Sequence, residues 1–291
     1  MALRLAAALT LAALLPGAYF VAIRPAQLRW GATAEEVTRA IPGDELVPSP
    51  TFCATRAITI DDSAAKIWPW LAQMGYDRAG FYGYDLIENL GSTSGIRSAK
   101  GIVPAWQHPQ TGDVLPISAV ARMYFGEIET DRYLIWRGRT NPSDGSIVWA
   151  LYPMDAGHTR LVSRIRLHYR WTQAALVLDL FTEFADPVAV PKILHGVKDR
   201  VEGRAPESLA LEGIQIAAWV AAAGELAAAL WLLFCWRRWW RAWLAGLAAG
   251  VTLLFVLYAR APVWMGAALV FGVFGMMFLA SRTDSENPQD A

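Results

Sequence analysis

Four apolar stretches dominate the hydropathy pattern of the chain, one near the N-terminus and three near the C-terminus. They cover residues 5–23, 213–235, 242–259 and 263–280. Each is close to the length of about 20 residues that a helix needs to cross the hydrocarbon core of a bilayer. Helices of a soluble bundle would alternate polar and apolar faces, and these stretches do not. The pattern therefore predicts four transmembrane helices.

The N-terminal stretch has a second interpretation as a cleaved signal peptide, with Arg4 as its charged start. No clear small-x-small cleavage site follows, and apolar residues continue to Ile23. We therefore favour the interpretation that residues 1–23 are an uncleaved membrane anchor. The domain boundaries that follow are a tether at 24–51, a globular domain at 52–203, three spans within 211–281 and a polar tail at 282–291.

Positive charge sets the predicted orientation of the chain. The short loop 236–241 holds Arg237, Arg238 and Arg241, and short cytoplasmic loops are the ones enriched in arginine and lysine. Four spans place this loop on the same side as both termini, so the domain is predicted to lie outside the cytoplasm. The cations that flank the domain oppose this orientation: Arg24, Arg29, Lys198, Arg200 and Arg204. We predict a multi-pass protein of the cell membrane.

Glu225 is the one ionisable residue well inside a predicted span. A charge at that depth costs about 2.5–3.5 kcal/mol on insertion scales, so the side chain should face other helices or be protonated. One interpretation is a proton or ligand site. The other, which we favour, is a hydrogen bond to a hydroxyl such as that of Thr252.

The globular part has the pattern of an α+β domain. Thr33 and Glu36 form a capping box in the tether. A strand at 55–60 precedes a helix whose apolar residues recur from Ile67 to Met74 at helical spacing. Five further strands are predicted between turn-forming residues, at 114–117, 121–129, 133–137, 146–152 and 159–169.

In the last strand, Leu161, Ser163 and Ile165 alternate with Arg164 and Arg166. An antiparallel sheet with one apolar face and one wet face is therefore expected. A closing helix should cover the apolar face. Its predicted inward stripe is Leu176, Leu180, Phe184 and Val188; its predicted polar side is Asp179, Glu183 and Asp186, with a break at Pro187 and Pro191.

The composition of the chain argues against several classes of function. The 291 residues carry no net charge, so no global field attracts nucleic acid. The four histidines and two cysteines have no metal-ligand spacing, and we predict neither a metal nor a cofactor. Cysteine usage is uninformative about compartment, because a disulfide between Cys53 and Cys235 is not expected.

Residues 80–89 form a cluster of aromatic and acidic side chains that has two interpretations. Tyr82, Tyr84, Asp85 and Glu88 could offer hydrogen bonds at the rim of a ligand pocket. Alternatively, Asp85 as N-cap and Glu88 three residues on would form the capping box of a short helix. We favour the capping interpretation for the two carboxylates and leave both open for the tyrosines.

Several segments resemble the START-like superfamily, which includes the polyketide cyclase-like and birch-pollen-allergen-like proteins. They are Ala57–Ile60 running into Ile67–Leu71, Phe125–Ile128 with Leu134–Trp136, and the hairpin from Trp149 to Leu161. The resemblance covers residues 52–203. It implies a helix-grip fold, in which a curved antiparallel sheet wraps a long C-terminal helix and leaves an apolar cavity. Members bind lipids, sterols or polyketides, a minority catalyse, and no shared catalytic motif can be carried over.

The expected function is therefore a membrane-tethered domain that binds a hydrophobic small molecule or lipid, without catalysis. The alternatives are a cyclase- or hydrolase-type enzyme and a structural or sensory membrane protein. Neither the oligomeric state nor the ligand is predicted. The candidate ligand contacts are Tyr82, Tyr84, Asp85, Glu88, Trp106, Trp136, Leu180 and Phe184.

Overall fold

The computed structural model describes residues 19–138 and 145–234. The chain divides into two units, one of residues 12–206 and one of residues 1–11 with 207–291. In the first unit the helical elements are η1 (Tyr19–Ile23), α2 (Arg24–Leu28), α3 (Ala34–Thr38), η2 (Asp44–Leu46), α4 (Ala64–Ala72), α5 (Asp85–Glu88), η3 (Pro104–Trp106) and α6 (Leu176–Val201). The described part of the second unit contains α7 (Leu209–Phe234).

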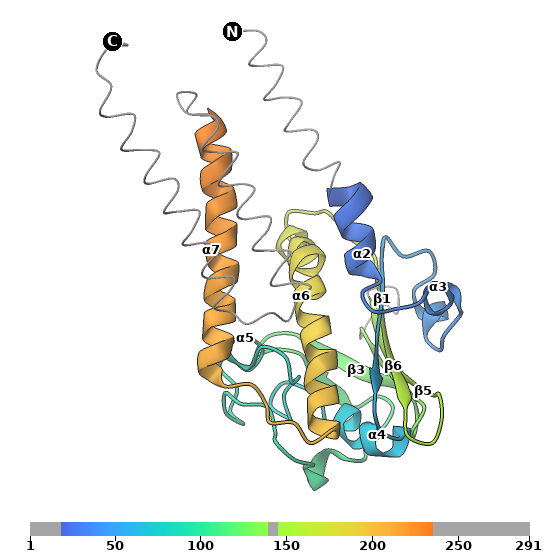
Figure 1. Ribbon diagram of the computed structural model, residues 1–291. Coiled ribbons are helices and arrows are strands. Elements are labelled where there is room, and N and C mark those ends of the chain that lie inside the picture. The colour runs from blue at the N-terminus through green and yellow to red at the C-terminus, as the bar shows by residue number, and fades with distance from the viewer. Residues whose placement is uncertain (1–18, 139–144, 235–291) are drawn as a thin grey trace, which may run out of the picture. The chain divides into compact units, whose positions relative to one another are not determined.

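Antiparallel strands form one six-stranded sheet in the order β1-β6-β5-β4-β3-β2. Their bounds are β1 Phe52–Ile60, β2 Val114–Pro116, β3 Arg122–Glu129, β4 Tyr133–Arg137, β5 Ser146–Pro153 and β6 Thr159–Leu167. Every predicted strand is present, and β1 begins earlier than expected. With α6 packed on the sheet, the unit is α+β and resembles a helix grip, as predicted (Figure 1).

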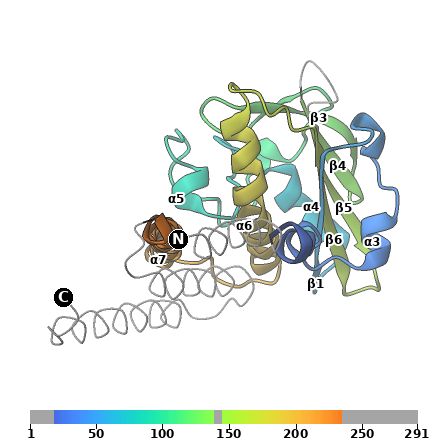
Figure 2. The ribbon, with the colours of Figure 1, turned by 90° about the horizontal axis from the view of Figure 1, so that it is seen from above.

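The sheet separates two layers. Figure 2 shows α4 and α6 on one side of the sheet and α3 on the other. The α6 side carries the main hydrophobic core, in which Phe125, Leu134 and Leu161 of the strands pack with Ile67 of α4 and Leu194 of α6. We call this side the concave face, after the fold that it resembles. Burial of these side chains is the main force that holds α6 on the sheet.

The opposite face is not wet, which corrects the prediction. Residues 29–47, predicted to be a tether, cover it. Arg164 is almost completely buried there: its guanidinium donates to the carbonyl oxygens of Glu36 and Arg39 and forms an ion pair with Asp44 at 2.6 Å. The predicted capping box of Thr33 and Glu36 is confirmed. Arg164 and Arg166 share one face, as predicted, but residues of the N-terminal segment pair with both of them there.

The first half of α6 buries the face that was predicted to be polar and exposes the face that was predicted to be apolar. Asp179 and Glu183 are buried, whereas Leu176, Leu180 and Phe184 are 41–58% exposed. The predicted inward stripe thus faces outward over these turns. Hydrogen bonds and ion pairs compensate the buried carboxylates, as described below, so the usual penalty for burying them is offset.

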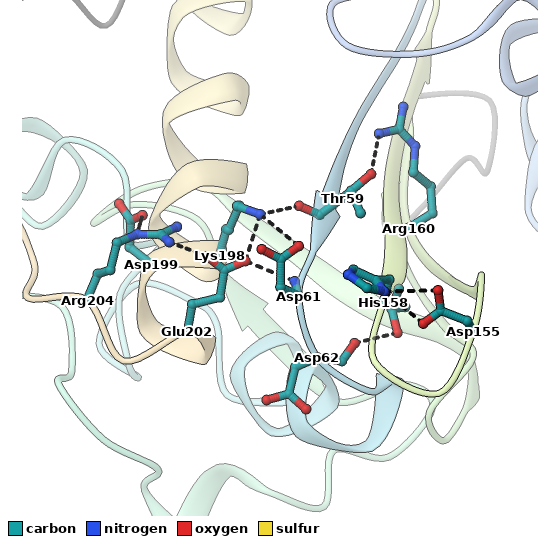
Figure 3. A network of polar contacts seen from close by, with 11 residues as sticks. Thr59, Asp61, Asp62, Asp155, His158, Arg160, Lys198, Asp199, Glu202 and Arg204 are labelled. Atoms are coloured by element: carbon teal, nitrogen blue, oxygen red, sulfur yellow. Dashed lines mark hydrogen bonds and ion pairs between the residues drawn. The ribbon is translucent and has the colours of Figure 1, made fainter.

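The second half of α6 packs on the core as expected and is anchored at its end. The helix continues through Pro187 and Pro191 without the predicted break, and both rings are buried against the domain. Figure 3 shows Lys198 bridging the end of α6 to the end of β1. Its ammonium donates to the carbonyl oxygen of Thr59 at 2.6 Å and lies 3.5 Å from Asp61.

No helix in residues 19–138 or 145–234 has both the length and the apolarity needed to cross a membrane. The predicted span 213–235 falls on α7, whose first turns carry Glu212 and Gln215, and it is not supported there. Several predicted segments lie outside the described residues. They are residues 5–18 of the first predicted span, the arginine loop 236–241 and the two spans at 242–259 and 263–280. The same holds for the side chain of Glu225.

Candidate ligand site

Tyr82, a predicted ligand contact, lies in the core between α4 and α6. Its hydroxyl donates to the carbonyl oxygen of Trp70 at 3.0 Å and accepts from Gln73 at 2.9 Å. Burial raises the pKa of this hydroxyl well above its ordinary value. The φ of Tyr82 is 68°, and its backbone touches α6 where Gly196 has no side chain. These contacts give Tyr82 a structural role in holding α6.

The two carboxylates of the same cluster organise the loop, although they form no capping box. The N-cap of α5 is Tyr84, whose side chain makes no capping hydrogen bond to the helix. Asp85 instead accepts from the backbone N–H of Ser98 at 3.0 Å and from its hydroxyl at 2.5 Å. Glu88 accepts from the backbone N–H of Gly83 at 3.1 Å. Both carboxylates have structural roles, but the predicted capping box is wrong, because α5 begins one residue earlier than expected, with Tyr84 rather than Asp85 as its N-cap.

The remaining predicted contacts do not gather at one place. The ring of Tyr84 lies under Lys192, and that of Trp106 under Arg78. Leu180 and Phe184 are exposed on α6. Trp136 is the predicted residue that lies deep in the concave face, where its ring contacts that of Trp149 with centroids 5.4 Å apart.

A row of polar side chains crosses the concave face beside Trp136. Arg56 of β1 pairs with Ser163 of β6, which pairs with Trp149 of β5. Residues directly opposite in an antiparallel ladder project to the same face with Cβ atoms about 4.5–5.5 Å apart. Arg56, Ser163 and Trp149 are each at most 1% exposed. We call these three residues together with Trp136 the concave polar row.

Three atoms of this row lack a hydrogen-bond partner among the described residues: Ser163 Oγ, Trp149 Nε1 and Trp136 Nε1. Buried polar side-chain atoms almost always have a partner, in the protein or in bound water or ligand. Leaving one without any partner costs about 1–3 kcal/mol. Three such atoms lie together among Phe125, Leu134 and other apolar side chains, so a bound molecule that accepts hydrogen bonds from them would offset this cost.

Asp186 of α6 faces this row and forms an ion pair with Arg56 at 2.6 Å. Burial raises the pKa of the Asp186 carboxyl above its ordinary value, against the attraction of Arg56. Arg56 also donates to the carbonyl oxygen of Gln27 at 3.0 Å. The pair thus ties the N-terminal segment, β1 and α6 together at the edge of the polar row.

Glu183, one turn earlier on α6, is the centre of a second cluster. It accepts from Arg24 at 2.5 and 3.1 Å, from the hydroxyl of Tyr169 at 2.6 Å and from that of Tyr19 at 2.7 Å. Burial alone would raise the pKa of Glu183, but these donors hold it below its ordinary value. We call these four residues the Glu183 clasp.

Sequence reasoning missed Arg56, Ser163 and Trp149 as site residues. The available signal was the alternation in β6, which places Ser163 between Leu161 and Ile165 on the apolar face. A polar residue at an apolar position of a half-buried strand is an exception to the pattern, and such exceptions mark sites that need explanation.

Solved structures similar to this chain were found at low identity. A protein from Mesorhizobium loti is 14% identical, with a TM-score of 0.31, and covers 52% of this chain and 98% of its own. A polyketide-cyclase-like protein from Corynebacterium glutamicum is 11% identical, with a TM-score of 0.34, and covers 52% and 91%. The Aha1 dimer from Colwellia psychrerythraea is 13% identical, with a TM-score of 0.28, and covers 52% and 97%. No protein-family model and no curated protein matches the sequence.

Proposed function

We propose that the domain binds an apolar small molecule or lipid between the concave face and α6. The observation that carries this proposal is the concave polar row, with three buried polar atoms that lack a partner among the described residues. Ligand sites combine mostly apolar walls with a few polar groups that fix the orientation of the ligand. The row and its surroundings have that composition.

The donors also indicate which polar group the ligand carries. An indole N–H can only donate, and a serine hydroxyl can donate or accept. A hydroxyl, carbonyl or ether oxygen would accept from Trp149, Trp136 and Ser163, while the apolar body lies against the aromatic and aliphatic side chains. We therefore propose an apolar ligand with at least one oxygen acceptor.

Mass spectrometry of molecules that co-purify with the full chain in mild detergent tests this function. Ser163→Ala removes one unpartnered hydroxyl from the concave face. Ser146→Ala is the matched control, because its hydroxyl is equally buried and also lacks a partner among the described residues, but Ser146 pairs with Arg166 on the opposite face.

We expect the wild type and Ser146→Ala to carry the same apolar molecule, and Ser163→Ala to carry at least tenfold less of it without a lower melting temperature. Equal occupancy in the two variants, or no apolar molecule with any of the three proteins, would contradict the proposal.

Membrane attachment is the second part of the proposed function. The apolar sequences 5–18, 242–259 and 263–280 support it, and the arginine loop 236–241 supports a domain outside the cytoplasm. In a chain without Cys53 and Cys235, a single cysteine placed by Val120→Cys would be accessible, since Val120 is 93% exposed. It should react with a membrane-impermeant maleimide in intact cells. Labelling only after lysis would mean that the domain faces the cytoplasm, opposite to the proposed orientation.

One observation favours an enzyme as the second candidate function. Asp186 is a carboxyl with a raised pKa that faces the concave polar row, and general acid–base catalysis uses such groups. Turnover of the co-purifying molecule by the wild type, with loss of turnover but retained binding in Asp186→Asn, would establish this alternative over simple binding.

A further inference from the structure

An exposed apolar surface lies at one end of the domain, where η1 meets the first half of α6. Its main residues are Phe20, Trp171, Val177, Leu178, Phe181 and Phe184, each 57–77% exposed. Tyr19 connects the two elements, since its ring lies 5.2 Å from that of Phe20 and 5.6 Å from that of Phe184. Figure 1 shows the start of α2 and the first turns of α6 at the same end of the domain. We call these six residues the end surface.

The carboxylates of these α6 turns are buried in hydrogen bonds rather than exposed on the end surface. Asp179 accepts from the backbone N–H groups of Arg170 and Trp171 at 3.1 and 2.8 Å, and Glu183 is held in its clasp. A helix facing water shows the reverse arrangement, with its charges outside and its apolar side chains inside. The fold therefore buries two carboxylates while it exposes leucine, valine and phenylalanine side chains.

We propose that the end surface docks on the interface of a lipid bilayer. The chain continues from Tyr19 into residues 5–18, which are uncharged and apolar, so the sequence that would enter the membrane starts from this surface. Tryptophan, tyrosine and phenylalanine side chains suit the boundary between headgroups and acyl chains.

This inference rests on the membrane attachment proposed above and adds which face of the domain meets the lipid. An α6 in contact with the bilayer would hold one wall of the proposed ligand site at the membrane surface. An apolar ligand could then pass between lipid and protein without crossing water, which excludes it.

Site-specific fluorescence in nanodiscs tests the proposal on the full chain. Single cysteines are introduced by Phe181→Cys and, separately, by Val177→Cys in a background with Cys53→Ser and Cys235→Ser. Val120→Cys is the control, because Val120 is exposed next to β2, at the sheet edge opposite β1. Each cysteine carries a polarity-sensitive dye, and the discs contain phosphatidylcholine and phosphatidylglycerol with or without doxyl-labelled acyl chains.

We expect blue-shifted emission at positions 181 and 177, with at least twofold quenching by the doxyl lipids, and neither effect at position 120. A blue shift without lipid quenching would mean that a protein segment or a second copy covers the surface, and would overturn the proposal. Unshifted emission at both positions would overturn it too. A chain that does not co-purify with the discs would overturn the attachment itself, which separates the two failures. Two test positions keep the result decidable if one variant does not fold.

Discussion

Glu183 shows how a single buried carboxylate connects distant parts of the domain. Its partners Arg24 and Tyr169 come from the N-terminal segment and from the end of the sheet. The Arg24–Glu183 pair is partly buried, and removing Glu183 leaves Arg24 and two tyrosine hydroxyls without their acceptor, at a cost of about 1–3 kcal/mol. Glu183→Ala should lower the free energy of unfolding by that amount in urea titrations of the detergent-solubilised chain. Glu35→Ala, at an exposed position, should change it by less than about 0.5 kcal/mol.

The same carboxylate makes stability depend on pH. Its donors lower the folded-state pKa of Glu183 below the ordinary value of about 4.3. The unfolded state therefore binds the proton more readily, and the contribution of Glu183 is present above that ordinary value and lost as the pH falls through the folded-state pKa. The urea midpoint of the wild type should fall on acidification below about pH 4. A fall of equal size in Glu183→Ala would assign the effect to other groups.

Gly196 is a position where even one methyl group is excluded. A Cβ there would lie 1.9 Å from the carbonyl oxygen of Tyr82. Gly196→Ala should push α6 away from residues 82–83 and lower the melting temperature clearly, with a loss of stability of about 1–3 kcal/mol or more. Gly101→Ala, where nothing lies within 4 Å, is the control and should change little. Equal melting of the two variants would contradict the close approach of α6.

At the scale of elements, the two halves of α6 have opposite patterns of burial. Its first half exposes apolar side chains, and its second half buries Val190, Leu194 and Val197. Leu194→Ala should cost about 2–5 kcal/mol, the range for truncating a leucine in a packed core. Leu180→Ala should cost less than about 1 kcal/mol, because Leu180 is 41% exposed. Thermal melting of both variants in detergent checks this, and similar losses would mean that the first half is covered by protein.

The sequence predicts the strands well and the orientation of α6 poorly, for a physical reason. Alternation with a period of two residues depends on neighbours in the sequence, and strands β2 to β6 lie close to their predicted bounds. In α6, the helical spacing of the residues separates an apolar face from an acidic face, but it does not determine which of the two faces is buried. That choice depends on Arg24, which lies 159 residues from Glu183 in the chain and is invisible to a local pattern.

At the scale of the molecule, the resemblance to START-like proteins anticipated the sheet with its long C-terminal helix. It did not anticipate that residues 29–47 cover the outer face of the sheet, where Arg164 and Asp44 pair. Nor did it locate the polar row, because the resemblance supplies no motif that could be carried over to residues of the concave face. The candidate residues taken from local clusters, such as Asp85, mostly organise loops.

The central claim is that an apolar ligand lies between the sheet and α6. Photo-crosslinking tests its location most directly. The full chain in nanodiscs is incubated with a diazirine-bearing fatty acid, illuminated and digested, and the modified peptides are mapped by mass spectrometry. We predict modification of β5 and β6 peptides that contain Trp149 and Ser163, and its loss when excess co-purified ligand competes. Modification confined to residues 29–47 or to segments outside 24–203 would contradict the claim.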